Sequence, residues 1–141
     1  MTTVIAILLF LVFFLLSLLH FYWGCGGHWG TGGVFPTKDD TIPAKSPGTT
    51  PTFIVALGLL GFGFFILANY EVINVSLPTW LEHFGPWIIA GIFIVRAMGD
   101  FKYVGFFKKY KRTKFGQYDT KYYSPLSLAI GTLILILEFL K

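Results

Sequence analysis

The chain has 141 residues, of which 55% are hydrophobic and only 13% are charged, and its formal net charge is +4. About a quarter of the residues in a soluble domain are charged, so this composition excludes an ordinary water-soluble globule. The lone cysteine excludes an internal disulfide. The basic residues lie beside apolar runs, which favours membrane phosphates over nucleic acid as their partner.

The first long apolar run, residues 4–23, predicts a membrane-spanning helix. No Lys or Arg precedes it, it is longer than a signal-peptide core, and no A-x-A-like site follows, so we interpret it as a retained span rather than a secretory signal. Residues 24–51 are rich in Gly and Pro and predict a loop. Their glycines fit neither G-x-G-x-x-G nor G-x-x-x-x-G-K-[ST], which favours close packing or a flexible backbone over a phosphate cradle.

Three further spans are expected, at about residues 52–70, 85–100 and 125–140. Gly85 and Pro86 predict the start of the third span, with the proline in its first turn. Ser124 and Pro125 are typical of the cap and first turn of the fourth. The expected fold is therefore all-α. It is a four-helix transmembrane bundle that forms a single membrane domain over residues 1–141.

A basic, aromatic loop separates the third and fourth helices. Four spans place this loop and the first loop on one side of the membrane, and the second loop and both termini on the other. Lys38 and Lys45 of the first loop join the many Lys and Arg residues of the third, whereas Lys141 alone lies on the opposite side. By the positive-inside rule, we predict a bacterial inner-membrane protein with loops 1 and 3 cytoplasmic and both termini outside.

This topology gathers polar and aromatic side chains at the cytoplasmic end. Arg96 and Asp100 lie four residues apart, so we expect an ion pair that either pins the third span to its neighbours or helps to build a polar pocket. Alternatively, Arg96 reaches lipid phosphates. We expect Asp119 to hold the loop, through Arg96 or a lysine. The candidate ligand-binding or polar cluster comprises His20, Tyr22, Trp23, Arg96, Asp100, Asp119, Tyr122 and Ser124.

Metal and nucleophile chemistry have weaker support. The spacing of His20, Cys25 and His28 matches no zinc pattern, so we expect no metal and no cofactor, and we favour hydrogen bonding of His20 to the basic loop. Cys25 as a nucleophile would need a lowered pKa and a base such as His28. A lone cysteine at the interface is usually inert.

Aromatic residues alternate with cations along the basic loop. In one interpretation the rings lie at head-group level while the cations meet anionic lipid. In a second, compatible interpretation, the loop folds back as a lid over the His20 and Arg96 end. The predicted lipid-phosphate contacts are Lys108, Lys109, Lys111, Arg112 and Lys114.

Three segments are similar to motifs of a bacterial integral-membrane family catalogued as domain of unknown function 3995: HFYWG at 20–24, RAMGDFKYVGFFKK at 96–109 and FGQYDTKYYSPLSL at 115–128. The resemblance covers nearly the whole chain. It implies a small four-span membrane protein, and it brings no known activity, ligand or catalytic residue. The family pattern marks His20, Trp23, Gly24, Arg96, Asp100, Gly105, Phe106, Asp119, Tyr122, Ser124 and Pro125.

Two hypotheses for function follow. The favoured one is a non-enzymatic accessory or interaction protein whose cytoplasmic face engages anionic lipid, a membrane-protein partner or a second copy of the chain. The alternative is a small membrane enzyme or binding protein for an amphiphile whose polar head lies near His20, Arg96 and Asp100. A lipid-sized cavity among those residues would favour the alternative. A transporter ranks last, because four spans without matching halves do not fit an inverted repeat.

Overall fold

The computed structural model describes residues 1–41 and 47–141. These residues contain four helices that are long and apolar enough to cross a membrane, and no strand. The chain is therefore an all-α, multi-pass membrane protein, as expected. The helical segments are α1 (Thr2–Gly24), the 3-10 turn η1 (Thr31–Gly33), α2 (Thr49–Asn69), α3 (Thr79–Met98), α4 (Lys114–Tyr118), the π-helical η2 (Asp119–Tyr123) and α5 (Ser124–Leu140).

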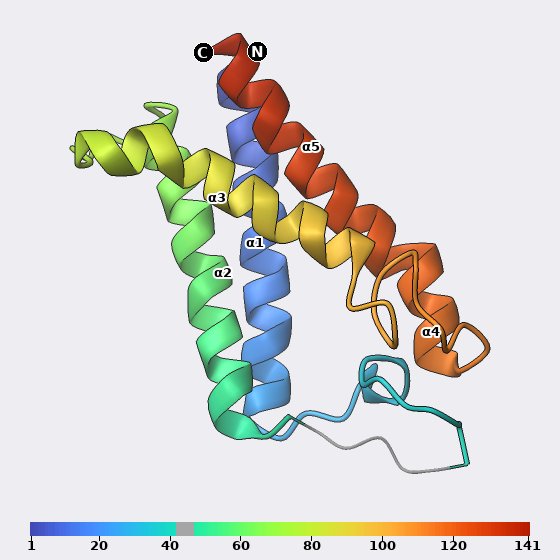
Figure 1. The fold of residues 1–141 in the computed structure, drawn as a ribbon. Helices are drawn as coiled ribbons and strands as arrows, with labels where there is room; N and C mark the ends of the chain where they lie inside the picture. Colours follow the sequence, from blue (N-terminus) through green and yellow to red (C-terminus); the bar gives the residue numbers. More distant parts are fainter. Residues whose placement is uncertain (42–46) are drawn as a thin grey trace.

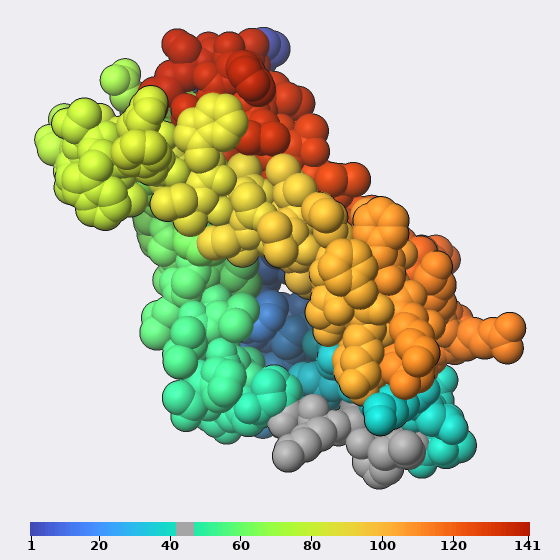
Figure 2. Space-filling view, viewed as in Figure 1, coloured from blue at the N-terminus to red at the C-terminus, as the bar shows by residue number. Residues whose placement is uncertain are grey.

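The long helices pack as two antiparallel pairs, α1 with α2 and α3 with α5 (Figure 1). The pairs meet through α1 and α5 and, over a shorter stretch, through α2 and α3. The core there includes Leu9 and Phe13 of α1, Ile66 of α2, Phe93 of α3 and Ile134 of α5. Away from this contact the pairs diverge, and Figure 2 shows an opening between them.

Glycine allows the closest approach within the second pair. A Cβ at Gly131 would lie 2.8 Å from Cγ1 of Ile94 and 3.1 Å from the carbonyl oxygen of Ala90. A side chain at this position would therefore push α5 away from α3. Small residues serve the same purpose at many contacts between membrane helices, where close packing replaces the hydrophobic driving force.

Two helix boundaries differ from the prediction. Helix α3 begins at Thr79 after Pro78, so Pro86 lies inside the helix rather than in its first turn. The fourth span begins before Ser124, because α4, η2 and α5 follow one another without a break. Thr113 caps this rod, and its Oγ1 accepts a hydrogen bond from the Gly116 N–H at 3.0 Å. Pro86 can lie inside α3 because a membrane helix tolerates proline where neighbouring groups satisfy the backbone carbonyl that it leaves free.

The first and third loops lie at one end of the molecule, which we call the basic end. The Asp40 carboxylate accepts a hydrogen bond from the Lys114 N–H at 2.9 Å, and the Tyr123 hydroxyl donates to the Gly33 carbonyl at 3.1 Å. Both termini lie at the opposite end, which we call the terminal end (Figure 1). This arrangement of loops agrees with the predicted topology. Lys45, which also entered the charge count, lies outside the described residues.

Candidate functional site

A buried carboxylate organises the basic end. Asp119, in η2, is fully buried. Its Oδ1 accepts a hydrogen bond from Arg96 Nη2 at 2.8 Å. Its Oδ2 accepts from the Gly105 N–H at 2.8 Å, from Ser124 Oγ at 3.0 Å and from Lys108 Nζ at 3.1 Å. One side chain thus joins α3, the basic loop and the last helix.

Lys108 is the cation that this carboxylate holds inside the loop. Besides Asp119, its Nζ donates to the Gly105 carbonyl at 2.8 Å and to Thr120 Oγ1 at 2.6 Å. These three acceptors use all three donors of an ammonium group. The Lys108 side chain has no exposed surface, so it does not contact lipid phosphates, and that prediction is corrected. Burial of a lysine requires a counter-charge, and Asp119 supplies it.

The prediction of an ion pair between Arg96 and Asp100 is wrong. Helix α3 ends at Met98, and Gly99 turns the chain at a φ of 89°, so Asp100 no longer shares a helical face with Arg96. Arg96 pairs with Asp119 instead, as the sequence analysis allowed. Its Nη1 is buried and has no hydrogen-bond partner in the described part of the chain.

Asp100 shapes the first turn of the basic loop. Its Oδ1 accepts the backbone N–H groups of Lys102, Tyr103 and Val104 at 2.9, 2.8 and 3.0 Å. Desolvation raises the pKa of Asp100, but these hydrogen bonds outweigh it and hold the pKa below its usual range. The carboxylate is therefore a turn-former, and the turn leads the chain to Gly105 and Lys108.

The other cations of the rod and loop remain on the surface. Three of their ammonium groups lie against neighbouring rings: Lys102 Nζ is 5.2 Å from the centroid of Tyr103, Lys109 Nζ is 5.9 Å from that of Tyr110 and Lys121 Nζ is 5.2 Å from that of Tyr122. Among the described residues, none of these surface cations forms an ion pair. We call this surface the basic face; its cations are Lys102, Lys109, Lys111, Arg112, Lys114 and Lys121.

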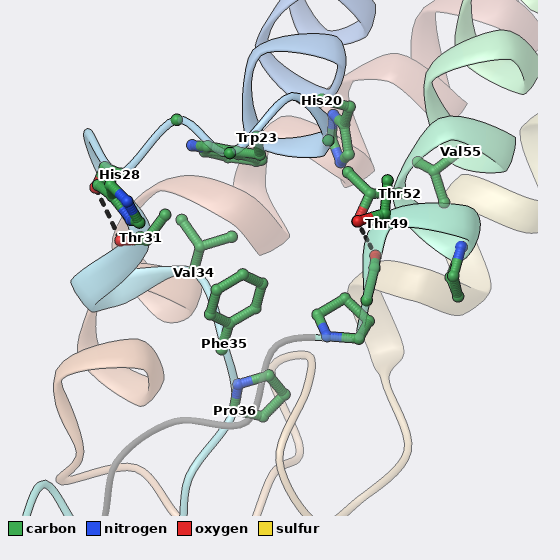
Figure 3. Close-up of a pocket in the computed structure, with 16 residues that line it drawn as sticks. His20, Trp23, His28, Thr31, Val34, Phe35, Pro36, Thr49, Thr52 and Val55 are labelled. Carbon is green, nitrogen blue, oxygen red and sulfur yellow. Dashed lines mark hydrogen bonds between the residues drawn. The ribbon is translucent and has the colours of Figure 1, made fainter.

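A cavity of about 710 Å³ lies at the same end, between the ends of α1 and α2 and the first loop (Figure 3). His20 and Trp23 of α1, Val55 of α2 and Val34 and Phe35 of the loop form much of its wall. Apolar atoms therefore dominate the wall, and the His20 imidazole adds a polar group to it.

His20 bonds within its own helix rather than to the basic loop, contrary to expectation. Its Nδ1 lies 2.7 Å from the Leu16 carbonyl. Because a carbonyl only accepts, Nδ1 is the donor in this contact. The ring packs edge-on against Trp23 at 5.2 Å between centroids, and Trp23 Nε1 donates to the Trp29 carbonyl at 2.8 Å.

A family model described as protein of unknown function (DUF3995) matches residues 13–134. The chain belongs to this family. The match includes the Asp119 contacts and the residues that line the cavity, so both features lie within the DUF3995 region. No curated protein and no solved structure matches the chain.

The predicted polar cluster of this DUF3995 protein is divided between separate places. Arg96, Asp119 and Ser124 meet at the buried carboxylate, whereas His20 and Trp23 line the cavity, and neither Arg96 nor Asp100 reaches it. The Tyr22 hydroxyl accepts from the Trp29 N–H at 3.2 Å. Tyr122 is exposed and packs on Tyr118. In the described part of the chain, no His, Cys, Asp and Glu side chains are grouped as a metal site would need.

Sequence reasoning did not assign Lys108 and Thr120 to the buried cluster. Lys108 and Lys109 are adjacent lysines in a basic run, and no local signal distinguishes the buried one from the exposed one. Gly105 could be singled out from the sequence, because the family pattern marks it. Its φ of 86° and its N–H bond to Asp119 give the physical reason for glycine there.

Proposed function

We propose that this DUF3995 protein is a non-enzymatic membrane protein that holds anionic lipid head groups on its basic face. The observation that carries the proposal is the division of the loop cations. Asp119 neutralises the one buried lysine, Lys108, while the cations of the basic face remain exposed and unpaired among the described residues. Each Lys or Arg near an anionic membrane surface contributes about 1 kcal/mol of attraction.

The Asp119 contacts give this face a fixed shape. Arg96 joins it to α3, Gly105 and Lys108 to the loop, and Ser124 to α5. A face held in one conformation loses less conformational entropy when a head group binds. The tyrosines beside its lysines suit the membrane interface, where an apolar ring and a polar hydroxyl are both accommodated.

The test uses the full chain in nanodiscs that contain phosphatidylglycerol and phosphatidylcholine. Substitution of Lys109, Lys111 and Arg112 by Gln removes three cations of the face, so we expect retention of phosphatidylglycerol in native mass spectra to fall about a hundredfold. Lys38→Gln, which removes a single exposed cation of the first loop outside the basic face, is the control and is expected to lower retention by no more than about fivefold. Equal retention by the triple variant and the unaltered chain would overturn the proposal, and a co-purifying protein lost from the triple variant would favour a protein partner.

We also propose that the basic end faces the cytoplasm of a bacterial cell, because the Lys and Arg residues concentrate there. Cys25 is a natural reporter, since it is the lone cysteine and lies exposed at that end. A membrane-impermeant maleimide should label Cys25 in inverted vesicles and leave it unlabelled in intact cells. The matched control is Asn74→Cys in a Cys25→Ser background, which should give the opposite pattern. Labelling of Cys25 in intact cells would reverse the proposed orientation.

A second candidate function is binding of an amphiphile in the cavity beside His20. The volume of about 710 Å³ lies within the range of ligand pockets, and the wall is largely apolar. A photoactivatable fatty acid should crosslink to the segments at residues 20–36 and 49–55. Val55→Trp, which fills the cavity, should abolish this labelling, whereas Val95→Trp on an exposed position of α3 should not. Labelling spread evenly over the helices would exclude the candidate.

A further inference from the structure

The terminal end contains a buried polar side chain without a partner. Asn69, the last residue of α2, is 5% exposed. Within the described part of the chain, neither its Oδ1 nor its Nδ2 makes a hydrogen bond of good geometry, although the side chain lies next to the Tyr70 hydroxyl and interacts weakly with it. An unpaired buried amide is costly, and proteins almost always give such a group a partner from the chain, water or a bound molecule. The two atoms of Asn69 require one acceptor and one donor.

Asn69 lines a recess of about 340 Å³ that is distinct from the cavity beside His20. Glu71 and Asn74, from the connection between α2 and α3, form one part of its wall. Glu82 of α3 and Lys141, from the end of the described chain, form another. The recess is thus built by segments from three parts of the chain, and polar groups predominate in it.

The charged groups around the recess favour a ligand that is mainly cationic and carries a smaller anionic group. Neither Glu71 nor Glu82 forms an ion pair among the described residues. Lys141 is the cation in the wall, and its Nζ lies 5.5 Å from the centroid of the Tyr70 ring. The Tyr70 hydroxyl donates to Glu138 Oε1 at 2.7 Å, and neither of these two residues lines the recess.

We infer that this recess binds a primary ammonium group with an adjacent oxygen acceptor, the chemistry of an ethanolamine head group. The ammonium meets the carboxylates of Glu71 and Glu82 and donates an N–H to Asn69 Oδ1. Asn69 Nδ2 donates to the ligand oxygen, and Lys141 faces a phosphate. The recess suits a head group rather than a whole lipid, because its volume is near the lower limit of ligand pockets.

The orphaned amide oxygen also predicts selectivity. A primary ammonium has N–H donors, whereas a quaternary ammonium has none, so a choline head group would leave Asn69 Oδ1 unpaired. A site built to hydrogen-bond a ligand rejects an analogue that lacks the donor, because a buried polar group is then left without a partner. Ethanolamine should therefore bind more tightly than choline.

The experiment uses the full chain in nanodiscs with equal amounts of phosphatidylethanolamine and phosphatidylcholine of matched acyl chains. Native mass spectrometry should show about tenfold preferential retention of phosphatidylethanolamine. Asn69→Leu, and separately the double variant Glu71→Gln with Glu82→Gln, should remove the preference. Asp39→Asn, which neutralises an exposed carboxylate in the first loop, should keep it. Equal retention of both lipids by the unaltered chain would overturn the inference, as would an unchanged preference in both recess variants.

A second arm distinguishes a lipid from a free ligand. Calorimetry with phosphoethanolamine in nanodiscs of phosphatidylcholine alone should give binding heat if a free head group fills the recess, and phosphocholine should give none. Preferential retention of the lipid without heat from phosphoethanolamine assigns the recess to a membrane head group. The triple substitution of Lys109, Lys111 and Arg112 should leave both readouts unchanged, so this inference can fail or survive independently of the basic face.

Discussion

Asp119 at the basic end and Asn69 at the terminal end are both buried polar side chains, but their surroundings are opposite. Both oxygens of Asp119 are occupied by donors from α3, the basic loop and α5. Neither polar atom of Asn69 makes a hydrogen bond of good geometry among the described residues. A satisfied buried group stabilises a fold, whereas an unsatisfied one destabilises it unless something binds. We infer from the contrast that Asp119 is a structural support of the basic end, whereas Asn69 belongs to the recess proposed above as a binding site.

The largest expected effect is that of Asp119→Asn. This change leaves the buried ammonium of Lys108 without a counter-charge, which costs about 3 to 5 kcal/mol for a buried pair. The Arg96 side chain is one-third exposed, so the loss of its ion pair with Asp119 adds less to this destabilisation. The thermal midpoint in detergent should fall by roughly 10 °C or more. Asp39→Asn on the exposed first loop is the control, and an unchanged midpoint in Asp119→Asn would show that the carboxylate is not the scaffold.

A matched pair of neighbouring lysines gives the next effect. Lys108→Met removes a buried donor that Asp119, Gly105 and Thr120 use, and should cost about 2 kcal/mol. Lys109→Met removes an exposed cation and should change the stability by less than about 0.5 kcal/mol. Thermal unfolding of the two variants side by side measures the difference. Equal midpoints would contradict the burial of Lys108.

A substitution at the terminal end is expected to change the stability in the opposite direction. Asn69→Leu replaces two unpaired polar atoms by apolar ones of similar volume, so the empty protein should become more stable by about 1 kcal/mol. The measurement is thermal unfolding in detergent without ethanolamine lipid. Destabilisation by this change would mean that the amide has partners in the empty state, and the contrast with Asp119 would disappear.

The smallest effect concerns pH and the exposed carboxylate of Asp100. Its pKa in the folded protein lies below the ordinary value of about 4, so its contribution to stability is present above that pH and is lost as the pH falls through the lowered pKa. Asp100→Asn should therefore weaken the turn at neutral pH and flatten this acid dependence. Thermal midpoints measured between about pH 3 and pH 7 test it, and identical profiles for both proteins would refute it.

The errors in the sequence analysis share a physical cause. The spacing of Arg96 and Asp100 predicts an ion pair only if the helix continues, and Gly99 ends it. Pro86 indicated a helix start, yet the chain already becomes helical at Thr79. Local signals define what a segment can form. In both places a second local signal, Gly99 or Pro78, decided where the helix ends or begins.

The sequence alone determined the membrane class, four helical spans and the concentration of cations at one end, because apolar length and charge are properties of local composition. It also carried the family resemblance. Only the tertiary structure decided which lysine Asp119 holds, how the predicted polar cluster divides and that Asn69 lines a recess without a partner. These depend on contacts between residues far apart in the chain, since a buried polar group is defined by what other helices bring to it.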